Sequence, residues 1–369
     1  MLEHQLVQIA LVPVITVLLS VWAFRRRRRI LASGMHATVP AFEQLTDASD
    51  IHSISGARRA RPALAGIGLN PLGRWLAACN AAVLAADVLL FSIRGLTLDW
   101  STTWLGAILL AALLIVWLNF YFVPGARDEL FAAEALFIVL LIVFLTNVAS
   151  PMQYGAVALG APYADPWLAA ADAAIGVHLP ALAAWTRAHP TISIAATLSY
   201  ATLLPQFLFA VILLAVLRER ERLWEFAFHF HFCLILAVAA LTIWPAVCPP
   251  TYYGFASTID MTRLMGQIQG FHDGTMKVVR FDELEGLVSM PSFHVAGALI
   301  VTWAFRSRAR ILIPLIVLNV ALMLSTFITG VHYVVDVIAV VPLCAGSLAA
   351  YRFWARRQLL GSTAAGADS

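Results

Sequence analysis

The sequence has few charged residues. They make up 12% of its 369 positions, whereas an ordinary soluble domain has about 25%. Hydrophobic residues make up 61%, and the mean hydropathy is +0.83. This balance excludes an ordinary soluble domain and predicts a polytopic membrane protein.

Lysine and cysteine are also scarce. Lys277 is the only lysine, and the four cysteines have no framework spacing, so we expect no structural disulfide. The net charge of +3 comes from arginines that occur in short clusters along a hydrophobic chain. We therefore interpret these charges by position in the membrane, and we expect no nucleic-acid partner.

Nine segments are long enough to cross a ~30 Å hydrocarbon layer as helices. The fold class that we predict is an all-α polytopic membrane protein with about nine transmembrane helices. An apolar pattern between residues 167 and 185 predicts one more helix, lying along the membrane surface. The predicted spans are approximately residues 6–24, 75–95, 104–123, 130–150, 192–217, 226–246, 289–305, 311–329 and 332–351.

The basic residues predict the orientation of these spans. The first span lacks the basic start of a signal peptide and is followed by the run from Arg25 to Arg29, so we expect a retained span whose N-terminus is outside. With alternating spans, 19 of the 24 Lys and Arg residues fall on the cytoplasmic side. The sequence therefore predicts a cytoplasmic C-terminus.

Two polar stretches near the C-terminus, residues 291–295 and 329–336, each open an apolar run. They contain His294, His332 and Asp336. Ionisable residues are costly at membrane depth and are usually retained there for function. With the predicted orientation both histidines lie at the extracytoplasmic face, and Asp336 is one helical turn after His332, within reach of its imidazole.

These residue types predict phosphoryl transfer through a histidine. An imidazole held by a carboxylate attacks phosphorus well, which suits His332 with Asp336. His294 can protonate the leaving oxygen and deprotonate the acceptor. Two helix N-termini beside the histidines would offer free N–H groups to a phosphate. A single histidine of this kind is more often just a hydrogen-bonded helix-end residue, but the three together favour function.

The stretches at residues 291–294 and 330–336 resemble the second and third signature motifs of the type-2 phosphatidic acid phosphatase superfamily, and most of all its inositol phosphorylceramide synthase branch. The resemblance covers about residues 150–360, including residues 165–168 with Asp172 and Gly176. It implies a helical-bundle core, a phosphohistidine on His332, Asp336 as its partner and His294 as acid and base.

The chain also departs from the family pattern. The third motif usually starts with Ser-Arg, but here it reads Ser325-Thr326, so one phosphate-binding guanidinium is absent. The first motif has no clean match. The loop at residues 248–290 is the expected substrate mouth, although its charges could equally be solvated. Tyr252 could shape the entrance or anchor at the interface, and we favour anchoring. The candidate substrate-binding residues are Lys277, Arg280, Arg263, Ser292, Gly330 and Tyr252.

We therefore predict a metal-independent lipid phosphotransferase or phosphatase that needs no cofactor. Its expected partners are a lipid phosphate or phospholipid substrate and the bilayer of a bacterial inner membrane; the oligomeric state is open. One alternative is a plain lipid phosphate phosphatase, and another is a non-catalytic transporter or scaffold. A transporter would place its ionisable residues near the bilayer midplane, whereas these lie at span ends.

The predicted organisation has four parts. Residues 1–72 form an N-terminal transmembrane helix and a basic cytoplasmic segment, and residues 73–150 form accessory helices. Residues 151–360 form the catalytic membrane domain, and residues 361–369 form a disordered tail.

Overall fold

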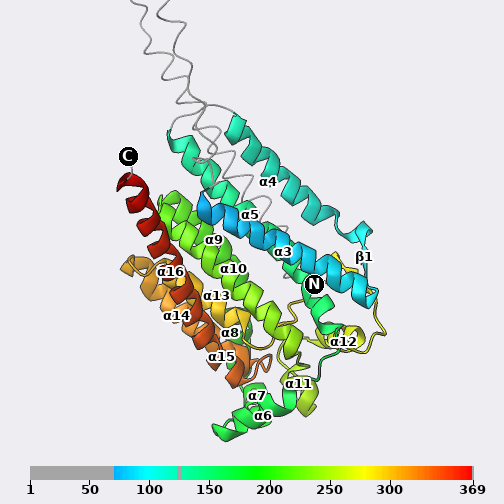
Figure 1. Cartoon of the computed structure of the whole chain (residues 1–369). Coiled ribbons are helices and arrows are strands. Elements are labelled where there is room, and N and C mark those ends of the chain that lie inside the picture. Colours follow the sequence, from blue (N-terminus) through cyan, green and yellow to red (C-terminus); the bar gives the residue numbers. More distant parts are fainter. Residues whose placement is uncertain (1–69, 123–126, 368–369) are drawn as a thin grey trace, which may run out of the picture.

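The computed structural model describes residues 70–122 and 127–367 of the chain. The predicted first span and the run from Arg25 to Arg29 lie outside the described residues. Within them the chain is a bundle of long helices with a small two-stranded sheet at its side (Figure 1). The prediction of an all-α polytopic membrane fold is confirmed.

The helices of the bundle follow the predicted spans in order. The sixth predicted span begins earlier than expected, the seventh begins at Phe293, and the last is divided in two at Ala339. The helices are α3 (Pro71–Arg94), α4 (Trp104–Phe122), α5 (Arg127–Val157), α8 (Pro190–Ala201), α9 (Leu203–Val216), α10 (Arg220–Ile243), α13 (Phe293–Ala304), α14 (Ala309–Ile328), α15 (Val334–Ile338) and α16 (Val340–Ala367).

The described part contains five helices that are each long and apolar enough to cross a membrane. The number rises to seven if two bent helix pairs are each counted as one span, one of them α8 with α9, bent by 41°. α13 is apolar but has only 12 residues. The predicted number of nine spans is therefore not confirmed.

The predicted surface helix at residues 167–185 is divided. α6 (Asp165–Ala174) and α7 (Leu179–Ala188) meet at an angle of 79°. Gly176 lies between them with a φ of +79°, a conformation that glycine adopts without a steric penalty. The apolar pattern is thus carried by two short helices, which lie with α15 at one end of the bundle (Figure 1).

The remaining elements lie in the loop between α10 and α13 and in the connection between α3 and α4. Strands β1 and β2 pair in parallel, with Thr97 opposite Val278 and Asp99 opposite Arg280. This pairing ties the long loop to the end of α3. The elements are α11 (Cys248–Tyr253), α12 (Thr262–His272), β1 (Thr97–Asp99), η2 (Trp100–Thr102), β2 (Val278–Arg280) and η3 (Phe281–Glu283).

Helix α10 is at the centre of the bundle. It packs against α3, α5, α9, α13 and α16, and most of its side chains are buried. Polar side chains join neighbouring helices, as expected where lipid gives no hydrophobic drive for helices to associate. Glu225 of α10 accepts hydrogen bonds from Trp303 and Arg306 near the end of α13, at 3.0 and 2.8 Å.

Two predicted boundaries fall inside helices. α5 runs without a break across residues 150 and 151, with Pro151 in its interior. A proline inside a membrane helix is tolerated because neighbouring groups can satisfy the freed carbonyl. α16 is helical to Ala367, so the predicted boundary at residue 361 lies inside it.

Candidate active site

His294 lies at the start of α13. Ser292 is the N-cap residue, and the second residue of the helix is His294, which is half-buried. Tyr200 of α8 stacks on the imidazole with ring centroids 4.0 Å apart, and its hydroxyl lies 3.2 Å from Nδ1. This contact fixes the orientation of the ring, and no described residue hydrogen-bonds its other nitrogen, Nε2. His294 can therefore present Nε2 to a substrate.

His332 is placed by a sharp turn after α14. Gly330 has a φ of +85°, and a Cβ on it would lie 2.9 Å from the Phe255 ring, so both the conformation and the space require glycine. The His332 N–H then donates to the carbonyl of Thr326 at 3.1 Å. The Thr326 hydroxyl donates to the Met323 carbonyl of its own helix at 2.7 Å, so the position that has an arginine in the motif this stretch resembles is here neutral and buried.

The contact expected between His332 and Asp336 is present. Nδ1 lies 3.3 Å from Asp336 Oδ2, and both side chains are buried. His332 precedes α15, so the contact spans a turn rather than a regular helix face. The same Oδ2 accepts hydrogen bonds from the Ser289 hydroxyl at 2.8 Å and the Tyr333 N–H at 3.0 Å. This carboxylate is thereby held against one side of the imidazole, which leaves Nε2 for chemistry.

The two motifs are joined directly. The Ser292 N–H donates to the Asp336 carbonyl at 3.2 Å, and the Ser292 hydroxyl lies 3.3 Å from His332 Nε2. The rings of His294 and His332 have centroids 6.3 Å apart. Two imidazoles at this separation can flank one phosphorus atom, one as nucleophile and the other as acid and base.

The two helix N-termini beside the histidines differ. No described residue accepts a hydrogen bond from the backbone N–H groups of Phe293, His294 and Val295 at the start of α13, which are directed toward the histidines' end of the bundle. At α15, in contrast, the N–H groups of Val334 and Val335 donate to the carboxylate of Asp172. The prediction of free N–H groups at both helix ends is therefore wrong for α15.

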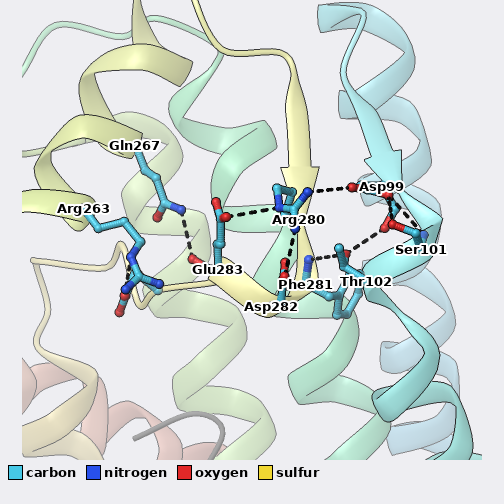
Figure 2. A network of polar contacts seen from close by, with 10 residues as sticks. Asp99, Ser101, Thr102, Arg263, Gln267, Arg280, Phe281, Asp282 and Glu283 are labelled. Atoms are coloured by element: carbon cyan, nitrogen blue, oxygen red, sulfur yellow. Dashed lines mark hydrogen bonds and ion pairs between the residues drawn. The ribbon is translucent and has the colours of Figure 1, made fainter. Parts of the chain in front are cut away.

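Arg280 is surrounded by carboxylates. Its guanidinium lies 2.9 Å from Asp99, 2.9 Å from Asp282 and 3.1 Å from Glu283 (Figure 2). A hydrogen bond from the Ser101 hydroxyl, together with the Arg280 charge, holds the pKa of Asp99 below its ordinary value. Arg280 thus closes the β1–β2 sheet, and its charge is compensated locally.

The other two candidate cations also have partners away from the histidines. The Lys277 ammonium donates to the Arg94 carbonyl at the end of α3, at 3.1 Å. Arg263, labelled in Figure 2, lies 3.8 Å from Glu285. Across the described ranges, none of the three cations contacts His294, His332 or Asp336. A phosphate-binding role for them stays a prediction.

Tyr252 lies at the edge of the site region. It is exposed on α11 and packs edge-on against Tyr253, with ring centroids 5.0 Å apart. The Tyr253 ring is in turn 6.5 Å from the ring of Tyr333, the residue that follows His332. Tyr252 is therefore separated from the histidines by another aromatic ring, which agrees with an anchoring position.

Two residues of the site were missed by sequence reasoning. Tyr200 lies in an apolar stretch of α8, and Ser289 precedes the second motif. Neither has a local signal, because each acquires its partner only when distant segments pack. No group of three or more His, Cys, Asp or Glu side chains within residues 70–122 and 127–367 could hold a metal ion.

Comparison with known proteins gives one match. The family model of the PAP2 superfamily matches residues 166–350, which contain both histidines and Asp336. No curated protein sequence and no solved structure matches the chain. Because the matched region is half of the chain and includes the paired motifs at the site, the protein belongs to the PAP2 superfamily, and this membership supports a phosphatase or phosphotransferase of lipid phosphates in general.

Proposed function

We propose that this protein transfers a phosphoryl group or a headgroup phosphate from a membrane lipid to an alcohol or to water through a phosphohistidine. The observation that carries the proposal is the arrangement of two imidazoles with ring centroids 6.3 Å apart, one of them held by a buried carboxylate. His332 is the nucleophile, Asp336 is its partner, and His294 is the acid and base.

The first step forms the covalent intermediate. His332 Nε2 attacks phosphorus, and the bond from phosphorus to the oxygen of the leaving alcohol breaks. His294 donates a proton to that oxygen, so the alcohol leaves neutral. Asp336 stabilises the positive charge that develops on His332, because its Oδ2 lies 3.3 Å from Nδ1. The Ser292 hydroxyl, beside Nε2, can donate a hydrogen bond to a phosphoryl oxygen.

The second step reverses the first with a new oxygen. His294 takes a proton from the acceptor, whose oxygen attacks phosphorus, and the bond from phosphorus to His332 Nε2 breaks. The free N–H groups at the start of α13 and the positive end of this helix suit the negative charge on the phosphoryl group throughout.

The acceptor is proposed to be an alcohol, as in the inositol phosphorylceramide synthase branch. The support is the neutral Thr326 in place of the arginine that the family usually carries in its third motif. A covalent phosphohistidine reacts with whichever hydroxyl reaches it, so the shape of the pocket decides between an alcohol and water.

The active site is proposed to face the extracytoplasmic side. Three arginines, Arg306, Arg308 and Arg310, follow the end of α13 opposite to His294. At that same end Arg222, in the first turn of α10, donates a hydrogen bond to the Ala304 carbonyl. An excess of arginine at one end of the spans marks the cytoplasmic side.

The test is a product assay with purified protein in detergent or vesicles. Labelled lipid phosphate and labelled phospholipid serve as donors, and both free phosphate and new lipid products are counted. We expect turnover by the wild type and an acid-labile phosphoenzyme that the His332→Ala variant does not form. Turnover retained by that variant would show that His332 is not the nucleophile.

A further inference from the structure

We propose that α6 positions the nucleophile: the carboxylates of Asp165 and Asp172 hold the segment that carries His332 and Asp336 in its reactive geometry. This inference rests on the proposed function of His332. It assigns Asp165 and Asp172 as positioning residues, because neither contacts the histidines and both act through residues 333–335.

Asp172 caps the helix that follows His332. Its Oδ2 accepts a hydrogen bond from the Val334 N–H at 3.0 Å, and its Oδ1 accepts one from the Val335 N–H at 2.9 Å. The Asp172 side chain is buried, with 1% exposure. α15 has five residues, too few to be stable as an isolated helix, so an external acceptor for its first N–H groups matters.

Asp165 holds the side chain of the residue next to His332. Its Oδ1 accepts a hydrogen bond from the Tyr333 hydroxyl at 2.9 Å, and its Oδ2 accepts one from the Val247 N–H at 2.8 Å. Asp165 and Tyr333 are both buried. The Tyr333 N–H donates to Asp336, so this residue is fixed at its ring and at its backbone.

The two carboxylates act on consecutive residues from one helix. Asp165 and Asp172 are seven residues apart, two turns of α6, so they lie on one face of it. Together they determine the positions of residues 333, 334 and 335, between the nucleophile and its carboxylate partner. The distance from His332 Nδ1 to Asp336 Oδ2 therefore depends on α6. The hydrogen bonds that Asp165 and Asp172 accept are of the stronger kind, because a carboxylate is the acceptor.

The key variant is Asp172→Asn. A carboxamide has one acceptor oxygen and directs its NH₂ group at the second backbone N–H, so one of the two hydrogen bonds is lost. We expect kcat to fall ~10- to 100-fold with KM nearly unchanged, because a displacement of about 1 Å in a reacting group costs a factor of that order. Asp165→Asn and Tyr333→Phe should act in the same direction, the latter more weakly.

The matched control is Asp273→Asn. Asp273 is an exposed carboxylate that accepts a hydrogen bond from the Thr275 N–H at 3.0 Å in a turn after α12, and it contacts no residue of the site. The same Asp273 oxygen also accepts a hydrogen bond from the Thr275 hydroxyl at 2.8 Å, and the side-chain oxygen of an asparagine there can still accept both. We expect wild-type kcat and KM from this variant.

A double-mutant cycle separates positioning from general stability. If Asp172 acts through the His332–Asp336 pair, the losses in kcat from Asp172→Asn and Asp336→Asn will not add, because both variants disrupt the same contact between His332 and Asp336. Additive losses, or a normal kcat for Asp172→Asn, would overturn the inference. If Asp172→Asn does not fold, Tyr333→Phe, which removes one oxygen, decides the question in the same cycle.

The outcome also separates this inference from the proposed function. A wild-type protein that forms no phosphoenzyme from lipid phosphates or phospholipids would overturn both. An active wild type whose Asp172→Asn and Tyr333→Phe variants keep the full rate of phosphoenzyme formation would overturn the role of α6 alone.

Discussion

Tyr200 lies flat against His294, with the two rings inclined by 20° and the phenol oxygen 3.2 Å from Nδ1. The ring that we assign as acid and base thus has a neutral partner, whereas His332 has a carboxylate. A carboxylate favours the positive charge that a nucleophilic imidazole acquires when it attacks, and a phenol orients its imidazole without adding charge. The two histidines are therefore suited to different roles.

The first prediction concerns the Tyr200 hydroxyl. Tyr200→Phe keeps the stacked ring and removes one neutral hydrogen bond, worth about 1 kcal/mol, so we expect kcat to fall ~5-fold. Tyr200→Ala also removes the ring contact and should lose more. Steady-state kinetics with a lipid phosphate donor measure both. A fully active Tyr200→Phe variant would show that the hydroxyl has no part in orienting His294.

The second prediction concerns the three residues that carry the chemistry. His332→Ala and His294→Ala should each abolish turnover while the protein still inserts and folds, because each removes a separate group from a two-step transfer. Asp336→Asn should lower kcat by ~10³- to 10⁴-fold, the order seen when the carboxylate that orients a catalytic histidine is neutralised.

The control for these variants is His178→Asn. His178 is exposed and accepts a hydrogen bond from the Ala181 N–H at the start of α7, a capping role that asparagine fills well. It should keep wild-type activity. Substantial turnover by His332→Ala would refute the assignment of the nucleophile, and a normal rate for Asp336→Asn would refute that of its partner.

The features that could be predicted from the sequence are those that depend on local patterns of residues. Hydropathy located the helices because each must satisfy its own backbone in lipid, and the spacing of His332 and Asp336 was enough to predict their contact. The position of Gly176 did not reveal the break between α6 and α7, because a glycine can also lie inside a membrane helix. The direction in which the chain continues after Gly176 depends on how the two helices pack.

What the sequence could not predict depends on distant partners. Tyr200 lies 94 residues from His294, and Asp172 lies 162 residues from Val334. Such contacts form only when the order of helices in the bundle is known. Arg280 was predicted to bind substrate because it lies in the loop before the second motif, and its contact with Asp99, 181 residues away in the chain, had no local signal.

The third prediction concerns orientation. Cys248 is buried, so thiol labelling requires introduced cysteines. Thr275→Cys lies in the exposed turn after α12, and Ser307→Cys lies in the exposed connection between α13 and α14, at the opposite end of α13 from His294. We expect an impermeant reagent to label Thr275→Cys in intact cells and Ser307→Cys only after permeabilisation. The reverse pattern would move the active site to the cytoplasmic side.

The last prediction is that the reaction needs no metal ion and favours an alcohol acceptor. Histidine supplies both the nucleophile and the acid, the tasks that a metal-bound water would otherwise perform, so a chelator should leave the rate unchanged. Loss of the rate with chelator, and its recovery on adding Mg²⁺ or Zn²⁺, would contradict this mechanism.

The acceptor is tested by adding inositol-type, glycerol-type and ceramide-type alcohols to a labelled lipid donor and counting products. We expect a new phosphorylated product to exceed free phosphate with at least one acceptor, because a few kcal/mol of pocket contacts select an alcohol over water. Free phosphate as the only product with every acceptor would instead identify a lipid phosphate phosphatase, with the same histidines and the same covalent intermediate.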